Sequence, residues 1–449
     1  MRFSGSFSQE RRKTGIMHMR KRWWISGILT VVLTAGFGTG NAGNGNQQLN
    51  MAGQDGITHV YAAECPDEET EIIPFRGRES YILSEWELET EGKLEQAAMV
   101  KQYISTMTLR EKVCQMIIAD PENLVTTHDV TKVDAEMKQA LADYPVGGIM
   151  LKSRNIENKK QLKKLLKNLQ KQSEIALFLA VDEEGGNVSR VLSNLGNREG
   201  GTINPMYEYK DDGTDTAFEN ARELGSNLAY YGFNLDFAPV ADVWSNPKNT
   251  VIGKRAYSDD YEQAAELIPY AVEGFHAGGV MCTLKHFPGH GDTVEDSHYG
   301  TAYVRATLKE LETQEFVPFR AGIRAGADCV MIGHLVVPDI SDQPADLSET
   351  LVTDCLRNEL AFHGLIITDS FQMEAITDHY EPGEAAVLAI QAGVDLILEP
   401  EDLGKTVEGI LTASDKGELT EKRIDESVER ILMAKQVNGI RIDHKIEKQ

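Results

Sequence analysis

The sequence is short of positive charge. Its 449 residues carry 45 lysines and arginines against 70 aspartates and glutamates, which gives a formal net charge of −25 at pH 7. A field of that sign repels a phosphate backbone, so the composition argues against nucleic-acid binding. Neutral ligands such as sugars are not excluded by it.

Cysteine is also scarce, and its five residues form no CxxC or CxxH pair. Their spacing therefore gives no indication of a structural zinc site. An odd number in a long chain does not suggest a disulfide framework, so we interpret the cysteines as small buried apolar residues. They are Cys65, Cys114, Cys282, Cys329 and Cys355.

Several cofactor and catalytic motifs are missing. No GxGxxG or GxxxxGK[ST] follows the first apolar run of the folded part, so nucleotide-binding folds lose support. The absence of a GxSxG elbow argues against a serine esterase. No HxH or HExxH indicates a catalytic metal, and Lys285 would add positive charge beside one, so we infer no metal and no cofactor. The alternative to this interpretation is a metal hydrolase in which the ion is bound by His286, His290, His298 and His334.

The N-terminus carries the longest apolar run. Residues 20–22 are basic, residues 23–38 are apolar, and small residues follow up to Gly43. This pattern predicts a secretory signal or signal anchor over residues 1–43, and an extracytoplasmic location. A run of about 16 residues is marginal for crossing a bilayer, so residues 20–40 are either a cleaved signal or a membrane tether.

A polar, acidic segment follows the apolar run. Residues 44–90 are rich in Gly, Asn, Gln, Asp and Glu and show little periodicity, which indicates a spacer. The folded domain is predicted to cover residues 91–440 and to begin with the helix that contains residues 94–104. Composition does not predict its oligomeric state.

Eight short apolar runs then alternate with amphipathic stretches. Such runs are typical of strands buried on both faces of a parallel sheet, and residues 159–172, 309–324 and 383–392 are predicted amphipathic helices. The alternation predicts an α/β fold with a single (β/α)8 TIM-type barrel, with an open doubly wound sheet as the alternative. The predicted strands are Gln115–Ala119, Gly147–Lys152, Ala176–Asp182, Asn234–Val240, Val280–Phe287, Cys329–His334, Leu365–Asp369 and Asp395–Glu399.

Polar residues gather at the carboxyl ends of these predicted strands. In a barrel those ends share one face, and active sites in this fold are built there. Two of the acidic residues, Asp242 and Glu399, are interpreted as helix caps instead. The polar residues include Asp182, Asp236, Asp242, Lys285, His286, His290, Asp292, His334, Asp369 and Glu399.

The segment after the fifth predicted strand carries a specific signature. Residues 285–298 read Lys-His-Phe-Pro-Gly-His-Gly-Asp-Thr-Val-Glu-Asp-Ser-His, which closely resembles the signature of the β-N-acetylglucosaminidase branch of glycoside hydrolase family 3. Residues 181–190, 237–243 and 367–373 resemble that family's substrate loop, fourth strand and nucleophile segment, in the same order. The resemblance spans about residues 95–437.

The resemblance implies an activity and a set of site residues. It implies a retaining exo-glycosidase that removes terminal β-linked N-acetylglucosamine from cell-wall muropeptides or chitin-type oligosaccharides. It implies that Asp369 is the nucleophile and that Asp296 and His298 form the acid/base dyad. The residues that it implies hold the substrate are Asp182, Arg190, Arg255, Lys285, His286 and His334.

These residue types suit the chemistry. A retaining glycosidase needs an anionic nucleophile, and Lys285 and Arg255 are expected to keep Asp369 ionised. The pKa of a histidine lies near neutrality, so His298 can give and take a proton, and Asp296 can orient its ring. Ser370 departs from the family pattern, which commonly has aspartate there. We expect this difference to affect the substrate preference and not the reaction.

Three alternatives stay open. A histidine acid/base repels an anionic phosphate less than a carboxylate would, so a phosphorylase of β-N-acetylglucosaminides is one of them. A catalytically weak protein that binds wall glycans is the second, and a β-glucosidase is the third, because the acetamido preference rests on the resemblance alone.

Overall fold

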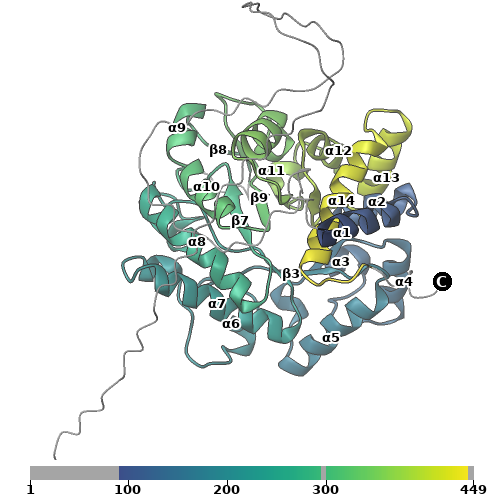
Figure 1. Ribbon diagram of the computed structural model, residues 1–449, viewed down its shortest axis with the longest axis horizontal. Helices are drawn as coiled ribbons and strands as arrows, with labels where there is room; N and C mark the ends of the chain where they lie inside the picture. The colour runs from purple at the N-terminus through teal and green to yellow at the C-terminus, as the bar shows by residue number, and fades with distance from the viewer. Residues whose placement is uncertain (1–90, 295–299, 443–449) are drawn as a thin grey trace, which may run out of the picture. The chain divides into compact units, whose positions relative to one another are not determined.

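The computed structural model describes residues 91–294 and 300–442 (Figure 1). The predicted signal, the spacer, Asp296 and His298 lie outside these residues. Every helix and strand described below belongs to one compact unit.

Eight parallel strands form one sheet in the order β6-β3-β2-β1-β12-β11-β9-β7. Neighbours follow chain order around the ring, and isolated bridges from Leu235 to Met281 and from Val240 to Lys285 join β6 to β7. The sheet is therefore a nearly closed barrel, which confirms the predicted barrel and makes the doubly wound alternative wrong. The strands are β1 (Ile117–Ala119), β2 (Gly148–Met150), β3 (Phe178–Val181), β6 (Leu235–Asp236), β7 (Thr283–Phe287), β9 (Cys329–Ile332), β11 (Leu365–Ser370) and β12 (Leu396–Leu398).

Each predicted strand overlaps one observed strand, and seven of the eight observed strands are shorter than predicted, whereas β11 extends one residue further, to Ser370. The clearest case is β6, which ends at Asp236 although its apolar run continues to Val240. Pro239 lies in that run and has no N–H to donate to a neighbouring strand. Asp182 and Glu399 lie just beyond the ends of their strands, whereas Lys285, His286 and Asp369 remain within β7 and β11.

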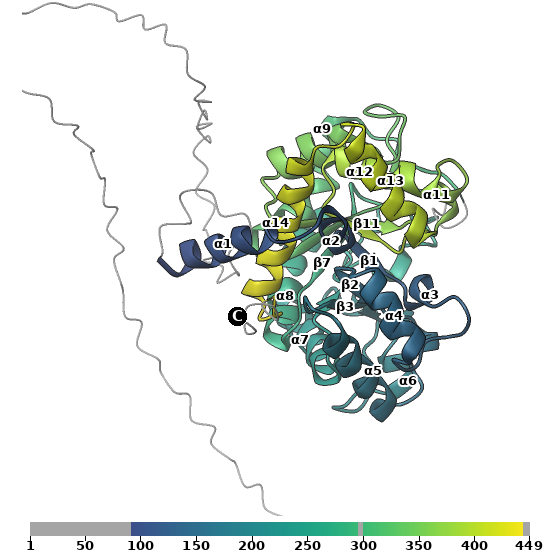
Figure 2. The ribbon, with the colours of Figure 1, turned by 90° about the vertical axis from the view of Figure 1, so that its right-hand side faces the viewer.

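Helices surround the strands (Figures 1 and 2). The predicted helix 159–172 is α5 (Lys159–Gln172), with Leu162 and Leu166 among its buried leucines and Asn158 as its N-cap. The other helices are α1 (Glu91–Ile104), α2 (Leu109–Gln115), α3 (Pro121–Leu124), α4 (Ala135–Asp143), α6 (Leu192–Leu195), α7 (Thr214–Tyr231), α8 (Tyr261–Gly278), α9 (Leu308–Thr313), α10 (Phe316–Arg324), α11 (Glu374–Thr377), α12 (Pro382–Ala392), α13 (Leu403–Asp415) and α14 (Glu421–Val437).

The prediction of a single helix over residues 309–324 is wrong. The segment is two helices, α9 and α10, separated at Gln314 and Glu315, and Gln314 has non-helical φ and ψ of −128° and −89°. Pro318 cannot donate the backbone hydrogen bond that would reach the carbonyl of Gln314 four residues earlier.

Shorter elements complete the described chain. Residues 350–359 form a π-helix, Thr350–Glu359. None of the helices in the described part of the chain is both long and apolar enough to span a membrane. The small strands are β4 (Glu183–Gly185), β5 (Val188–Ser189), β8 (Ala302–Tyr303) and β10 (Leu335–Val336), and single 3-10 turns are Ser153–Asn155, Met206–Tyr209, Gly253–Arg255 and Ala345–Leu347.

One lysine is buried inside the fold. Lys435 in α14 is fully buried, donates a hydrogen bond of 2.9 Å to Gln115 Oε1, and places its ammonium 4.9 Å from the centre of the Phe178 ring. Burial lowers the pKa of Lys435 to about 7. The unfolded chain keeps this amine protonated up to about pH 10, so the lysine destabilises the fold increasingly as the pH falls from 10 towards 7.

Replacement of this lysine by an apolar residue of similar length is expected to stabilise the protein. Lys435→Met should raise the free energy of unfolding at pH 7 by about 1–3 kcal/mol, because the desolvation of the amine is removed. The gain should shrink at pH 10, where the amine is neutral in both states. Chemical denaturation at both pH values measures this, with the exposed Lys422→Met as the control. A destabilised Lys435→Met variant would contradict the interpretation.

Candidate active site

A cleft of about 670 Å³ opens at the carboxyl ends of the barrel strands. Six residues that the sequence predicts for the site line it: Asp182, Arg190, Arg255, Lys285, His286 and Asp369. They come from five separate parts of the chain, and the barrel brings them together. A second depression, of about 640 Å³, lies between α12 and α13, but its lining contains neither histidine nor aspartate.

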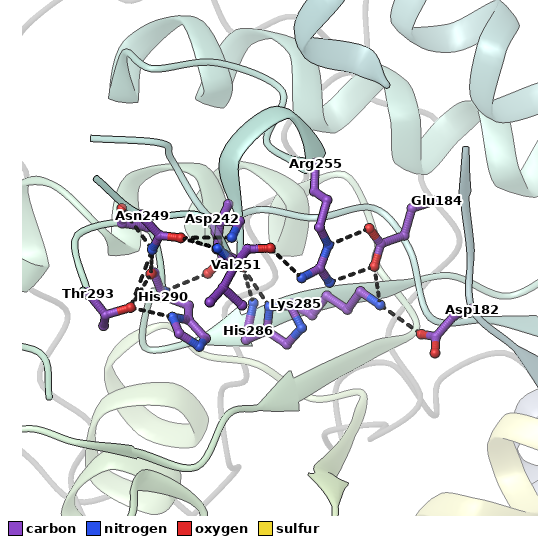
Figure 3. Close-up of polar contacts among 12 residues, drawn as sticks. Asp182, Glu184, Asp242, Asn249, Val251, Arg255, Lys285, His286, His290 and Thr293 are labelled. Atoms are coloured by element: carbon purple, nitrogen blue, oxygen red, sulfur yellow. Dashed lines mark hydrogen bonds and ion pairs between the residues drawn. The ribbon is translucent and has the colours of Figure 1, made fainter. Parts of the chain in front are cut away.

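One buried carboxylate holds two of the cations in the cleft (Figure 3). Glu184 accepts two hydrogen bonds of 2.8 Å from Arg255, and its Oε1 atom lies 2.6 Å from Lys285 Nζ. Lys285 also donates to Asp182 Oδ1 at 2.8 Å. The side chains of Glu184 and Lys285 are 4% and 3% exposed, so this ion pair is nearly closed to solvent.

The charges in this network stabilise each other. Burial alone would raise the pKa of Glu184, but Arg255 and Lys285 outweigh it and hold that pKa well below its usual range. Burial likewise opposes the charge of Lys285, but Asp182 and Glu184 raise its pKa above the ordinary value. Both cations therefore stay charged at neutral pH, and their positions are fixed before a ligand arrives.

The local sequence explains how Glu184 reaches the cations. Gly185 and Gly186 have φ angles of 83° and 60°, in the left-handed region that favours glycine, and they make the turn between β4 and β5. A Cβ atom on Gly186 would lie 2.2 Å from the ring of Pro205. This tight turn directs Glu184 towards the carboxyl end of β7.

A second buried carboxylate orders the histidine loop. Asp242 is 1% exposed, and its Oδ2 atom lies 2.6 Å from His286 Nδ1. It also accepts the backbone N–H groups of His286 at 3.0 Å and of His290 at 2.7 Å. The prediction that Asp242 caps a helix is therefore wrong: the residue fixes the ring of His286 and the turn that follows β7.

Asp369 lies at the carboxyl end of β11, on the wall of the cleft. Burial raises its pKa, but His286 and His334 offset that effect and bring the pKa below the ordinary value. Lys285 lowers this pKa less than the histidines do. Arg255 was also expected to lower it, but is not among the main causes of the shift. Asp369 is thus an anionic group on a rigid strand, kept charged chiefly by the two histidines.

His334 lies behind Asp369 and not in the lining of the cleft. It is fully buried, its Nδ1 atom lies 3.0 Å from Asp346 Oδ2, and its Nε2 atom lies 2.9 Å from the carbonyl oxygen of Ser370. Burial lowers its pKa, but Asp346 more than compensates and raises it to about 9. The imidazolium therefore holds the backbone immediately after Asp369.

A further charged cluster forms another part of the cleft wall. Lys152 Nζ lies 2.8 Å from Glu399 Oε1 and 3.0 Å from Asp120 Oδ2, and Arg154 pairs with Asp120. Burial raises the pKa of Glu399 to about 7. The predicted cap role of Glu399 is wrong, because the N-cap of α13 is Asp402.

Several of these residues were not predicted from the sequence. Glu184 lies two residues after Asp182, inside the segment that resembles the substrate loop, so its charge was an available signal. Lys152 ends a predicted strand and could have been found in the same way. Asp346 had no signal, because it follows β10 in a segment without a recognisable pattern, and only the fold brings it to His334.

The predicted acid/base pair, Asp296 and His298, lies in residues 295–299, outside the described residues. The last described residue before this segment is Val294. It directly follows a turn in which the Nδ1 atom of His290 and the Oγ1 atom of Thr293 are 2.6 Å apart. Their assignment stays a prediction from the sequence.

A family model for the glycosyl hydrolase family 3 N terminal domain matches residues 108–434, which is more than half of the chain. The chain belongs to glycosyl hydrolase family 3. The resemblance drawn from residues 285–298 is thereby confirmed at the level of the family. The family 3 match includes all eight barrel strands.

Curated relatives in family 3 are similar over part of their length. β-Hexosaminidase A of Pseudoalteromonas piscicida is 33% identical over 289 residues, which are 60% of this chain and 48% of that protein. β-Hexosaminidase of Xylella fastidiosa is 36% identical over 272 residues, which are 60% of this chain and 80% of that protein. The chain thus spans about half of the first relative and four fifths of the second.

Solved structures show the same barrel. A family 3 β-N-acetylglucosaminidase from Paenibacillus sp. has a TM-score of 0.69 at 36% identity, and the match covers 75% of this chain and 63% of that one. A β-glucoside phosphorylase has a TM-score of 0.67 at 25% identity, covering 77% and 61%.

The Asp346–His334 pair predicts a pH-dependent stability. The raised pKa of His334 contributes stability that is fully present below about pH 6.5 and is lost as the pH rises through about 9. Asp346→Asn should therefore lower the free energy of unfolding by about 2–3 kcal/mol at pH 6 and by much less at pH 9.5. Denaturation curves at both pH values measure this, with the exposed Asp342→Asn as control. An equal loss at both pH values would contradict the charge of His334.

Proposed function

We propose that the protein is a retaining exo-glycosidase that hydrolyses terminal β-linked N-acetylglucosamine from cell-wall muropeptides or chitin-type oligosaccharides. The observation that carries this proposal is the state of Asp369. It is an anionic carboxylate at the end of β11, on the wall of a cleft lined by fixed polar donors. A retaining glycosidase needs such a group beneath the anomeric carbon.

Each side chain has a part in the proposed reaction. Lys285, Arg190 and His286 bind sugar hydroxyls, and Asp182 accepts hydrogen bonds from sugar hydroxyls. Asp369 attacks the anomeric carbon while the bond to the leaving oxygen breaks, and His298 gives that oxygen a proton. Water then cleaves the glycosyl–Asp369 ester, and His298 takes back a proton. Asp296 orients the imidazole of His298.

The acetamido sugar is favoured by the relatives. Both curated proteins are named β-hexosaminidases, and the Paenibacillus structure is named a β-N-acetylglucosaminidase. The predicted export signal over residues 1–43, which lies outside the described residues, supports an extracytoplasmic wall or glycan substrate. The proposed location is therefore outside the cytoplasmic membrane.

Phosphorolysis is the second candidate function. The solved β-glucoside phosphorylase shares the barrel at 25% identity, and a histidine acid/base leaves room for an anionic acceptor. In that reaction phosphate, in place of water, attacks the glycosyl–Asp369 ester. A dependence of the rate on phosphate separates the two reactions.

The experiment is release of p-nitrophenol from its β-N-acetylglucosaminide and from its β-glucoside by residues 44–449, with and without phosphate. We expect at least about tenfold higher kcat/KM for the acetamido sugar, without an effect of phosphate. Acceleration by phosphate would make the protein a phosphorylase. No release of p-nitrophenol from either sugar by the folded protein would favour a glycan-binding protein without turnover.

The acid role of His298 predicts a leaving-group effect. His298→Ala should lower kcat/KM for a disaccharide by about 10²–10⁴-fold, and much less for the p-nitrophenyl glycoside, because p-nitrophenol leaves without full protonation. Steady-state kinetics on both substrates measure this, beside the exposed His128→Ala as the control. Equal losses on the two substrates would argue against the acid role.

A further inference from the structure

Three potential metal ligands meet at the end of the barrel opposite the cleft. His276 lies in the last turn of α8, Cys282 directly precedes β7, and Asp328 directly precedes β9. One donor atom from each residue lies within 4.8 Å of the other two. The sequence predicted no metal site, because these three residues come from separate elements and form no short motif.

The distances between the donor atoms fit a small metal ion. Cys282 Sγ lies 3.8 Å from His276 Nε2, and His276 Nε2 lies 2.7 Å from Asp328 Oδ2. Zinc bonds of about 2.0 Å to nitrogen and 2.3 Å to sulfur place such a pair roughly 3.6 Å apart in a tetrahedron. The nitrogen–oxygen pair needs to open by about half an ångström, which a small rotation of either side chain provides.

The surroundings suit a bound ion. Asp328 and Cys282 are fully buried, and the carboxylate is held in place by the backbone N–H of Cys282 at 2.9 Å. The side chain of His276 is 11% exposed, so an ion can enter past it, and a water molecule can take the fourth position. A site with sulfur, nitrogen and oxygen donors favours zinc over magnesium or calcium.

We propose that His276, Cys282 and Asp328 form a zinc site that ties the end of α8 to the starts of β7 and β9. On binding, Cys282 gives up its thiol proton to solvent, and His276 presents the lone pair of Nε2 while its proton resides on Nδ1. The ion replaces the hydrogen bond between His276 and Asp328. The site is separate from the cleft, and the proposal does not depend on the proposed reaction.

The test is titration of the chelator-treated full chain with Co²⁺ and then Zn²⁺. One equivalent of Co²⁺ should give the near-ultraviolet absorption of a thiolate–cobalt bond, and Zn²⁺ should abolish it. Zn²⁺ should also raise the thermal midpoint by several degrees, because the ion binds the folded state. Loss of a residue that only supports a ligand typically weakens metal binding 10–100-fold. Because Cys282 would bind the ion directly, its loss should weaken zinc binding by more than that.

Variants decide which residues bind the ion. Cys282→Ser should remove the absorption band, whereas Cys355→Ser, which removes another buried thiol, should keep it. If Cys282→Ser does not fold, His276→Gln, at the most exposed of the three ligands, provides the same test through zinc affinity and the thermal midpoint. Absence of the band in the folded protein, or a band that survives Cys282→Ser, would overturn the proposal and leave the three residues as a hydrogen-bonded clamp.

Discussion

The arrangement of the cleft depends on the ion pairs that the buried Glu184 carboxylate makes. It fixes Arg255 through two hydrogen bonds and Lys285 through a contact of 2.6 Å. Without it, two cations would be left partly desolvated in the same place, a situation that costs several kcal/mol in buried ion pairs. The hairpin of β4 and β5 places Glu184, so the tight glycine turn at its tip is a requirement of the site.

The same arrangement recurs around the cleft. Asp242 orders His286, Asp346 keeps His334 protonated, and both histidines in turn favour the anionic form of Asp369. Arg255 and His286 are each held by a carboxylate that is less exposed than they are. Such preorganisation lets a site present charges to a substrate without reorganising when it binds. The barrel supplies the rigid strand ends that this requires.

Much of the fold could be predicted from the sequence, because buried parallel strands leave continuous apolar runs. The site could be predicted only in part. Lys285 and Asp369 belong to recognisable local segments, whereas Asp346 becomes important through a contact across the fold. Local patterns also misled, since Asp242 and Glu399 resemble caps in the sequence but pair with His286 and Lys152.

The central claim is that Asp369 attacks the sugar. Its most direct test is trapping of the covalent intermediate with a fluorinated N-acetylglucosaminyl fluoride, followed by peptic digestion and mass spectrometry. The account predicts one label per chain, on the peptide that contains Asp369. A label on another carboxylate of the cleft, such as Glu399, or no label on a protein that turns over substrate, would contradict it.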